Sequence, residues 1–242
     1  MRKMTATAIT IALTAISSCT EAESKGHDMK HTDVEQVIKE NLVVRLQAQR
    51  KALIELDQKE RKQAFAIVKE AIYNDPRDVS FGPKEAKVTI VEFFDYNCGF
   101  CKQSTGWLKG VIDKYPDDVR IVFKELPLLD GHTKTSRNAA KAALAAARQD
   151  KYLTMHYALM AERSLTKERI LSLSKKADID IEKLTKDMED PDLNLQLEDG
   201  LLLATRIPYI QGTPFFIIND NFVSGGNIKT LDTLLEKALK ES

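Results

Sequence analysis

Two cysteines, Cys98 and Cys101, form a C-x-x-C motif, a spacing at which two thiols can exchange a disulfide or bind a metal. The motif follows residues 88–94, which are β-branched and aromatic and predict a buried strand. After Asp95 the apolar residues recur at helical spacing, so Cys98 falls where a strand turns into a helix. Unpaired N–H groups and the positive end of the helix dipole lower the pKa of a thiol there.

The C-x-x-C motif has a second interpretation, as half of a zinc site. Zinc takes four protein ligands in a structural site, and no second C-x-x-C or Cys/His pair follows at metal-ligand spacing. We therefore interpret Cys98 and Cys101 as a redox pair, and we expect neither a metal nor a bound cofactor.

Composition excludes some classes of function. The chain of 242 residues is 43% hydrophobic, which is enough for a sizeable core. Its 36 basic and 36 acidic residues balance, so the sequence shows no basic footprint for nucleic acid. Only the amino terminus approaches a membrane span in character, and it is too short to be one.

The amino terminus predicts export. Residues 1–18 read as a signal peptide, because Arg2 and Lys3 precede an apolar stretch that ends in a polar switch. Ile16-Ser17-Ser18-Cys19 resembles a bacterial lipobox, in which Cys19 would be acylated and would anchor the protein to the outer membrane. Ordinary cleavage, for instance after Ala22, is the alternative and would remove Cys19. Both alternatives place the protein in the periplasm.

Export decides between a structural and a catalytic role for the pair. With either cleavage, Cys98 and Cys101 are the only thiols left in an oxidising compartment. A disulfide that closes so short a loop adds little stability compared with one that closes a long loop. The pair is therefore predicted to be catalytic.

A helical region precedes the catalytic residues. After a polar tether at 19–32, residues 33–75 lack glycine and predict helix. The amphipathic spacing breaks near Gln49 and near Glu60, which favours two or three helices over one rod. The apolar stripe either packs on its own domain or pairs with another subunit. We predict pairing, so that residues 33–75 form an oligomerisation arm.

The second domain is expected over residues 79–242, after a turn-rich boundary. Residues 119–124 predict a second strand, and strand, helix and strand in this order give a right-handed parallel βαβ unit. Strand signals then vanish over a helical insertion at about 133–206. A hairpin of strands at 215–218 and 222–224 and a helix at 228–239 close the chain.

This order of elements resembles the thioredoxin fold. The helical insertion makes the chain similar to the DsbA-like family of exported bacterial thiol–disulfide oxidoreductases. The resemblance implies an α/β protein with a thioredoxin fold and a helical insertion, preceded here by the helical arm. Three motifs carry the match: EFFDYNCGFC at 92–101, FKELPL at 123–128 and GTPFF at 212–216.

The resemblance implies a role for each matching position. Cys98 would be the exposed nucleophile and Cys101 the resolving thiol. Thr213-Pro214 would be the cis-proline step of the family, beside the disulfide, with backbone groups free to pair with a substrate strand. Gly99-Phe100 would also contact the substrate.

The resemblance implies a further role for Glu92, the buried acid that accepts or relays the proton of Cys101. A charge in an otherwise apolar strand is costly to bury, so it should be rare without a function. Lys124, on the neighbouring strand, either pairs with Glu92 or points to solvent, and both alternatives stay open.

Two departures from the oxidising archetype of the family bear on whether the protein forms or isomerises disulfides. Gly99-Phe100 replaces Pro-His, so no histidine stabilises the Cys98 thiolate. We therefore predict a pKa of Cys98 below that of free cysteine and above that of the archetype. Thr213 precedes the proline as in dimeric isomerase relatives, which also use a Gly-aromatic dipeptide. With the arm, the chain is similar to oligomeric members with isomerase or dual activity.

The predicted function is disulfide formation or isomerisation in exported proteins, through Cys98 and Cys101. The expected partners are exported proteins with thiols or disulfides, a membrane redox partner and further copies of the chain. The alternative is a lipid-anchored chaperone or surface binding protein whose thiols are not essential. The direction of exchange and the choice between dimer and trimer stay open.

Overall fold

A computed structural model describes residues 31–207 and 209–241. The chain divides into two compact units, residues 1–54 and residues 55–242. The predicted signal peptide, the candidate lipid attachment at Cys19 and nearly all of the tether lie outside the described residues.

The described part of the first unit is helical and belongs to α1 (His31–Tyr73). Large apolar side chains along it are exposed, with Ile38, Leu42, Leu46 and Leu53 each between 54% and 67% accessible.

Helix α1 is continuous from His31 to Tyr73, so the predicted division into two or three helices is wrong. The apolar pattern does break near Gln49 and Glu60, but such a break removes no backbone hydrogen bond. The segment contains no proline or glycine, the residues that commonly break or kink a helix, so the backbone hydrogen bonds continue through both positions.

The second unit is built on a five-stranded sheet with the strand order β1-β3-β2-β4-β5. Strands β2 and β3 pair in parallel, and the remaining pairs are antiparallel. Helix α2 (Gly99–Lys114) makes the crossover between the two parallel strands. The strands are β1 (Val79–Phe81), β2 (Val88–Phe94), β3 (Val119–Glu125), β4 (Phe215–Ile218) and β5 (Asn221–Ser224).

Strand β1 has no counterpart in the sequence prediction, which read this stretch as part of a turn-rich boundary. It is short and forms by pairing with β3, where Val79 lies opposite Phe123. Gly82 ends it with a φ of +96°, and a Cβ there would lie 2.1 Å from Val119 O. This strand therefore depends on a distant partner and on a glycine, and the local pattern shows neither dependence.

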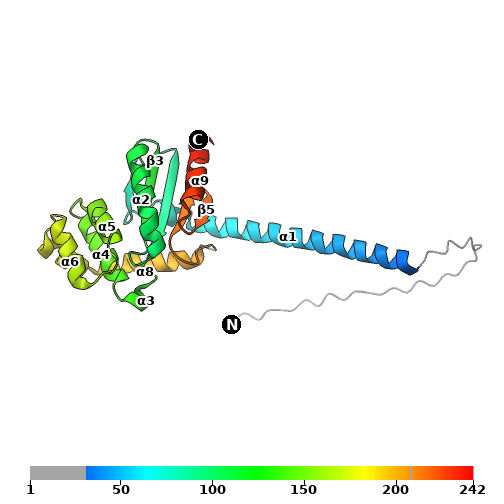
Figure 1. The fold of residues 1–242 in the computed structure, drawn as a ribbon, viewed down its shortest axis with the longest axis horizontal. Helices are drawn as coiled ribbons and strands as arrows, with labels where there is room; N and C mark the ends of the chain where they lie inside the picture. Colours follow the sequence, from blue (N-terminus) through cyan, green and yellow to red (C-terminus); the bar gives the residue numbers. More distant parts are fainter. Residues whose placement is uncertain (1–30, 208, 242) are drawn as a thin grey trace, which may run out of the picture. The chain divides into compact units, whose positions relative to one another are not determined.

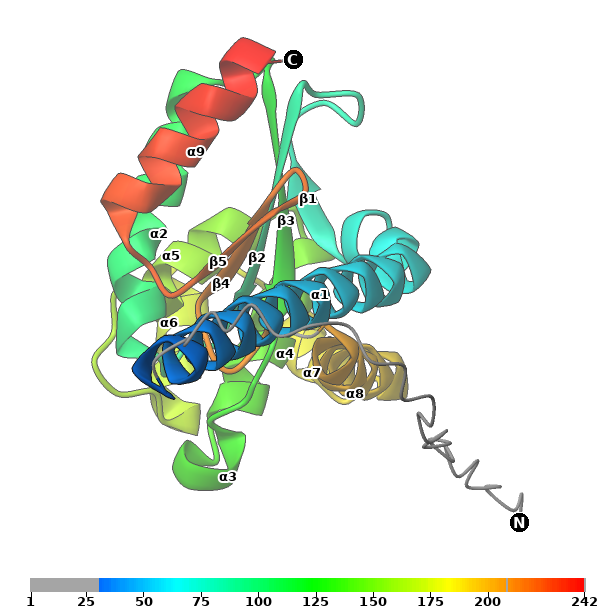
Figure 2. The ribbon, with the colours of Figure 1, turned by 90° about the vertical axis from the view of Figure 1, so that its right-hand side faces the viewer.

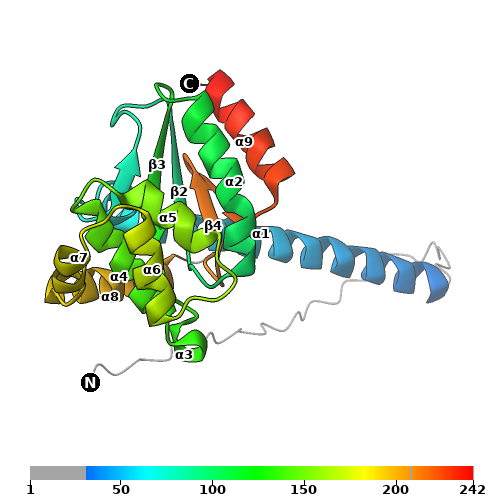
Figure 3. The ribbon, with the colours of Figure 1, turned by 60° about the vertical axis from the view of Figure 1, so that its left-hand side comes forward.

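One face of the sheet is covered by α2, by α9 (Ile228–Glu241) and by the helical insertion, as Figure 3 shows for α2 and α9. The insertion comprises α3 (Asp130–Thr133), α4 (Ser136–Ala147), α5 (Tyr152–Met160), α6 (Lys167–Lys176), α7 (Ile181–Met188) and α8 (Pro191–Arg206).

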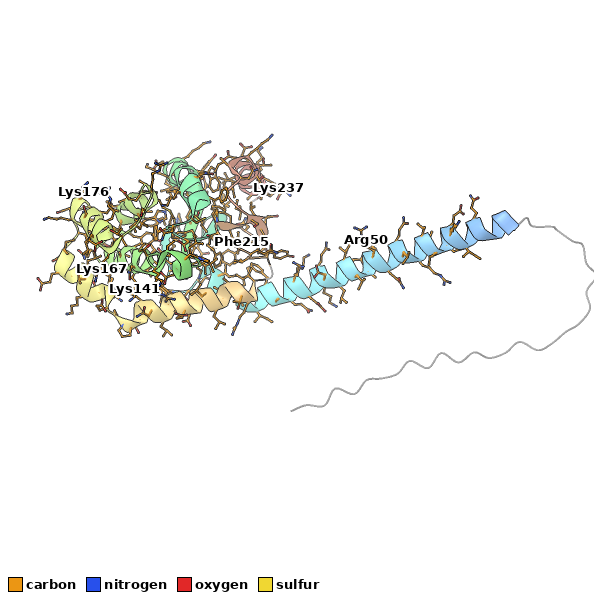
Figure 4. All side chains as sticks on the ribbon, turned by 60° about the horizontal axis from the view of Figure 1, so that its bottom comes forward. Arg50, Lys141, Lys167, Lys176, Phe215 and Lys237 are labelled. Carbon is orange, nitrogen blue, oxygen red and sulfur yellow. The ribbon has the colours of Figure 1, made fainter. Side chains whose placement is uncertain are left out.

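The insertion helices gather beside the sheet (Figure 1). Lys167 and Lys176, at the two ends of α6, lie at the surface, whereas Phe215 of β4 lies inside the domain (Figure 4). The core on the insertion side includes the alanine-rich helix α4, whose small side chains allow close packing.

The opposite face is covered by the second part of α1 and by the end of α8 (Figure 2). Phe65, Val68 and Ile72 of α1 are buried there against Val91 and Phe93 of β2, among others. The domain was predicted to start at Val79, whereas the compact unit starts at Glu55, because these α1 side chains are part of its core.

Candidate redox-active site

Cys98 is the N-cap of α2, with extended backbone angles, and its N–H donates to Asp95 O at 3.0 Å. Cys98 exposes only 8% of its surface and is buried, so it is less accessible than the exposed nucleophile that the resemblance implied, because it packs against the Thr213–Pro214 loop; Cys101, in the first turn of α2, is fully buried. Both are free thiols. The strand–turn–helix junction therefore presents one sulfur near the surface and holds the second one beneath it.

The pKa of Cys98 is lowered to about 5. The hydrogen bond from the Cys101 thiol is the largest cause, and backbone N–H groups at Phe100 and Cys101 add to it against the opposing effect of burial. The direction agrees with the prediction from the helix N-terminus. Cys98 is thus a thiolate at neutral pH, the form that attacks a disulfide.

The pKa of Cys101 is raised far above its ordinary value. Burial is the largest cause, followed by the hydrogen bond that Cys101 donates to Cys98 and by the nearby charge of Glu92. The two thiols therefore differ in role, because Cys98 is ready to attack while Cys101 keeps its proton until a base removes it.

Glu92 is fully buried in β2. Its Oε1 accepts a hydrogen bond from Ser104 Oγ at 3.1 Å, and its Oε2 has no hydrogen-bond partner among the described residues. Burial raises the pKa of Glu92 to about 8, with Ser104 acting against the rise and Cys98 adding to it. A carboxyl group that titrates near neutral pH is suited to accept and return a proton.

Lys124 neither pairs with Glu92 nor points to solvent, so neither alternative from the sequence holds. In the register of β2 and β3, Glu92 lies opposite Phe123, and Lys124 lies opposite Phe93. Successive side chains of a strand point to opposite faces, so Lys124 and Glu92 lie on different faces of the sheet. Lys124 is buried in an ion pair with Asp78.

The Thr213–Pro214 peptide bond is cis, as predicted. Thr213 O lies 3.1 Å from Cys98 Sγ and accepts its hydrogen bond when the thiol is protonated. Gly226 approaches both Phe100 and Pro214, since a Cβ there would come 3.3 Å from Phe100 O and 3.4 Å from Pro214 Cγ. A larger residue at Gly226 would therefore press on both sides of the site, a role that the sequence reasoning missed.

Gly99 and Phe100, between the two cysteines, are exposed, and Phe100 exposes 65% of its surface. An exposed phenylalanine beside a reactive thiol offers apolar contact area to an incoming chain. Of the residues for which the resemblance implied substrate contact, Gly99 and Phe100 follow Cys98 directly in the chain, and Thr213 contacts its sulfur.

Asp95 and Asn97 organise the loop before Cys98, and the sequence reasoning assigned no role to either. Asp95 is buried and accepts hydrogen bonds from the N–H of Asn97, from Ser136 Oγ and from the N–H of Leu129 at 2.7–2.8 Å. Asn97 Nδ2 also donates to Ser136 Oγ at 2.9 Å. Asp-x-Asn just before a helix is a recognisable Asx-turn signal.

A second buried polar cluster ties the same loop to the insertion. Tyr96 and Tyr152 both donate to Glu125 Oε1, at 3.0 and 2.9 Å, and Tyr96 Oη lies 3.1 Å from His156 Nδ1. Burial raises the pKa of Glu125 well above its ordinary value and lowers the pKa of His156 to about 3. Burial thus disfavours the charged form of both groups in the cluster.

The described residues contain no group of three or more His, Cys, Asp or Glu side chains arranged to hold a metal ion. Within the same part of the chain, no helix combines the length and the apolar character needed to cross a membrane.

A family model described as Thioredoxin matches residues 74–237, more than half of the chain. The chain belongs to the thioredoxin family, and the predicted fold is confirmed.

Solved structures narrow the class within this family. A thioredoxin-like oxidoreductase from Silicibacter pomeroyi is 34% identical, with a TM-score of 0.63 over 71% of this chain and 97% of the other. The thiol-disulfide exchange protein alpha-DsbA2 from Wolbachia pipientis is 26% identical, with a TM-score of 0.68 over 77% and 98%. The resemblance to DsbA-like thiol–disulfide oxidoreductases is therefore confirmed.

A curated relative described as an antiporter matches part of the chain. The Na(+)/H(+) antiporter NhaA 3 from Salinispora tropica is 32% identical over 167 residues, which cover 68% of this chain and 25% of the antiporter. The chain spans about a quarter of the length of the first curated relatives it matches.

Proposed function

We propose that the protein is a thiol–disulfide oxidoreductase that forms or isomerises disulfides in exported proteins through Cys98 and Cys101. The observation that carries this proposal is the split between the two thiols. Cys98 has a pKa lowered to about 5 at the N-terminus of α2, and Cys101 lies buried beside it with a raised pKa. A lowered pKa keeps Cys98 reactive at neutral pH and makes it a good leaving group.

Exchange can run in either direction at this site. In oxidation, a substrate thiolate attacks Cys98 of the Cys98–Cys101 disulfide and forms a mixed disulfide, which a second substrate thiolate resolves by displacing Cys98. In isomerisation, the Cys98 thiolate attacks a wrong substrate disulfide, and Cys101 releases the substrate if rearrangement stalls. Glu92 accepts the proton of Cys101, while Gly99, Phe100, Thr213 and Pro214 contact the substrate chain.

We assign isomerase activity to an assembly of several chains joined through residues 33–75. The exposed stripe of Ile38, Leu42, Leu46 and Leu53 supports this assignment, because an apolar helix face in water gains by pairing with another copy. Several active sites held in one assembly can act on one misfolded substrate. The proposed location is the periplasm, with an outer-membrane anchor if Cys19 is acylated and with a membrane redox partner.

The test compares the chain from His27 with a chain that starts at Glu55, since a start at Val79 would remove the core residues Phe65, Val68 and Ile72. Refolding of a scrambled substrate with several disulfides is measured beside oxidation of a reduced peptide, and light scattering gives the oligomeric state. We expect only the longer chain to assemble and to rescue the scrambled substrate, while both oxidise the peptide.

Two variants sharpen this test. Leu42→Ser combined with Leu46→Ser leaves the chain length unchanged and should reproduce the loss of assembly and rescue. Cys98→Ser should abolish both activities. If Cys98→Ser still protects a client from aggregation as well as the unmodified chain does, and exchange is absent from both, the protein is a binding protein whose thiols are not essential.

A further inference from the structure

Ser104 lies on α2 one turn after Cys101 and is fully buried. Its Oγ is 3.1 Å from Glu92 Oε1 and 3.0 Å from the backbone oxygen of Cys101. A hydroxyl group has a single hydrogen, so it donates fully to one of these oxygens at a time. The oxygen of Cys101 also accepts from Thr105 Oγ1 at 2.9 Å. Cys101 O is therefore satisfied without Ser104, whose hydrogen is free for Glu92.

The surroundings of Glu92 supply little else. Its register neighbours on β3 and β4 are Phe123 and Phe216, and the fully or nearly fully buried residues of α9 are apolar. Among the described residues, Ser104 is the one side chain that donates a hydrogen bond to Glu92, and Oε2 of Glu92 has no partner. Cys98, Cys101 and Tyr96 are titratable groups that interact electrostatically with Glu92.

We propose, resting on the proposed function, that Ser104 is a positioning residue for proton transfer from Cys101 to Glu92. By donating to Oε1, Ser104 holds the ionised carboxylate in one orientation and leaves Oε2 to take the proton. After the transfer, the hydroxyl hydrogen can turn to Cys101 O. The carboxyl group can thus change its charge without a rearrangement of the surrounding core.

The step that Ser104 assists is release of a mixed disulfide between Cys98 and a substrate cysteine. Cys101 gives its proton to Glu92, and the Cys101 sulfur attacks Cys98 Sγ. The bond from Cys98 to the substrate breaks, the substrate leaves as a thiolate, and the Cys98–Cys101 disulfide forms. The protein thiols lose two electrons and the substrate disulfide gains them, while Glu92 later returns its proton to the leaving thiolate or to water.

The electrostatics of Glu92 set the expected size of the effect. Burial raises the pKa of Glu92 to about 8, and the Ser104 hydrogen bond acts against this rise. Without the hydroxyl the pKa rises further, so a smaller fraction of Glu92 is ionised at neutral pH. Ser104→Ala should move the pH midpoint of the release step upward by about one unit and slow that step about tenfold at pH 7.

The experiment follows a single turnover of the full mature chain, fully reduced, with a peptide disulfide that carries a separate fluorescent reporter on each half. Release of the first reporter measures attack by Cys98, and release of the second measures the step that needs Cys101. Both rates are recorded from pH 5 to pH 10, within the range in which each variant stays folded by circular dichroism.

Thr105→Val is the matched control, because it removes a buried hydroxyl from the same helix and the same backbone oxygen without touching Glu92. We expect the upward shift of the second rate in Ser104→Ala, no shift in Thr105→Val, and an unchanged first rate in both. In a Glu92→Gln background, Ser104→Ala should have no further effect on the pH profile.

Two failures can be told apart in this design. If the unmodified chain forms no mixed disulfide on Cys98, the proposed function fails. If the mixed disulfide forms and resolves with the same pH midpoint in Ser104→Ala as in the unmodified chain, exchange stands and the role of Ser104 is refuted. The role of Ser104 is also refuted if Ser104→Ala shifts the pH midpoint of the release step equally in the Glu92→Gln background.

Discussion

Two buried carboxyl groups, Glu92 on β2 and Glu125 at the end of β3, lie on the same face of neighbouring parallel strands. Both have raised pKa values because burial penalises the charged form. They differ in their partners. Glu125 receives two tyrosine hydroxyls on one oxygen, whereas Glu92 has a single serine donor and one oxygen without a partner.

The difference separates a structural acid from a reactive one. Glu125 joins Tyr96, in the loop before Cys98, to Tyr152 in the insertion, so it acts as a fixed hydrogen-bonded junction. Glu92 is electrostatically coupled to both thiols and keeps an unpaired oxygen. An unsatisfied buried acceptor costs free energy, and such a cost is expected where the group changes its protonation state during function.

The largest expected effect on stability comes from truncating the structural acid. Glu125→Ala leaves two buried tyrosine hydroxyls without their acceptor and opens a cavity, so we expect a loss of about 3–5 kcal/mol in the free energy of unfolding. Glu125→Gln keeps the shape and one oxygen that can accept from both tyrosines, so it should cost only about 1 kcal/mol. Urea unfolding at pH 7 measures both variants, and equal losses would contradict the role of the Glu125 oxygen as acceptor for the two tyrosines.

A Glu→Gln substitution at Glu92 should slow the release step, whereas the same substitution at Glu125 should not. Glu92→Gln removes the proton acceptor, so we expect the release step that needs Cys101 to slow by about 10- to 100-fold at pH 8. Glu125→Gln, the matched control, should leave that rate within about twofold, since it touches neither thiol. Single-turnover reporter release gives both rates. If the release step slowed equally in Glu92→Gln and Glu125→Gln, the division into a reactive and a structural acid would be wrong.

Sequence reasoning singled out Glu92 as a buried acid of the site but assigned no role to Glu125, for a physical reason. Glu92 stands out because it interrupts an apolar strand at a fixed distance from Cys98. Glu125 acquires its role from Tyr96, in the loop before Cys98, and from Tyr152 and His156, both on α5. Each of these residues alone has the pattern of an ordinary core position, and only the folded chain brings them together.

Other outcomes follow the same rule. The strand–helix junction at Cys98 and the insertion helices depend on neighbouring residues, and the sequence predicted them. The cis peptide before Pro214 was predicted from the family resemblance of its motif. The burial of Lys124 depends on strand register, and the burial of Phe65 depends on which surface α1 meets. Periodicity shows that a face is apolar, but it does not show what covers that face.

The smallest effect on stability is expected from removing one of the two tyrosine hydroxyls that donate to Glu125. Tyr152→Phe keeps the ring that stacks with His156 and removes one of the two donors to Glu125. Tyr96 still donates to the same oxygen, so the free energy of unfolding should fall by about 1 kcal/mol and both steps of exchange should keep their rates. Urea unfolding and single-turnover kinetics on the same preparation provide the measurement. A change in the pH midpoint of the release step would show instead that the Glu125 cluster reaches the thiols, and the two acids would then form one functional network.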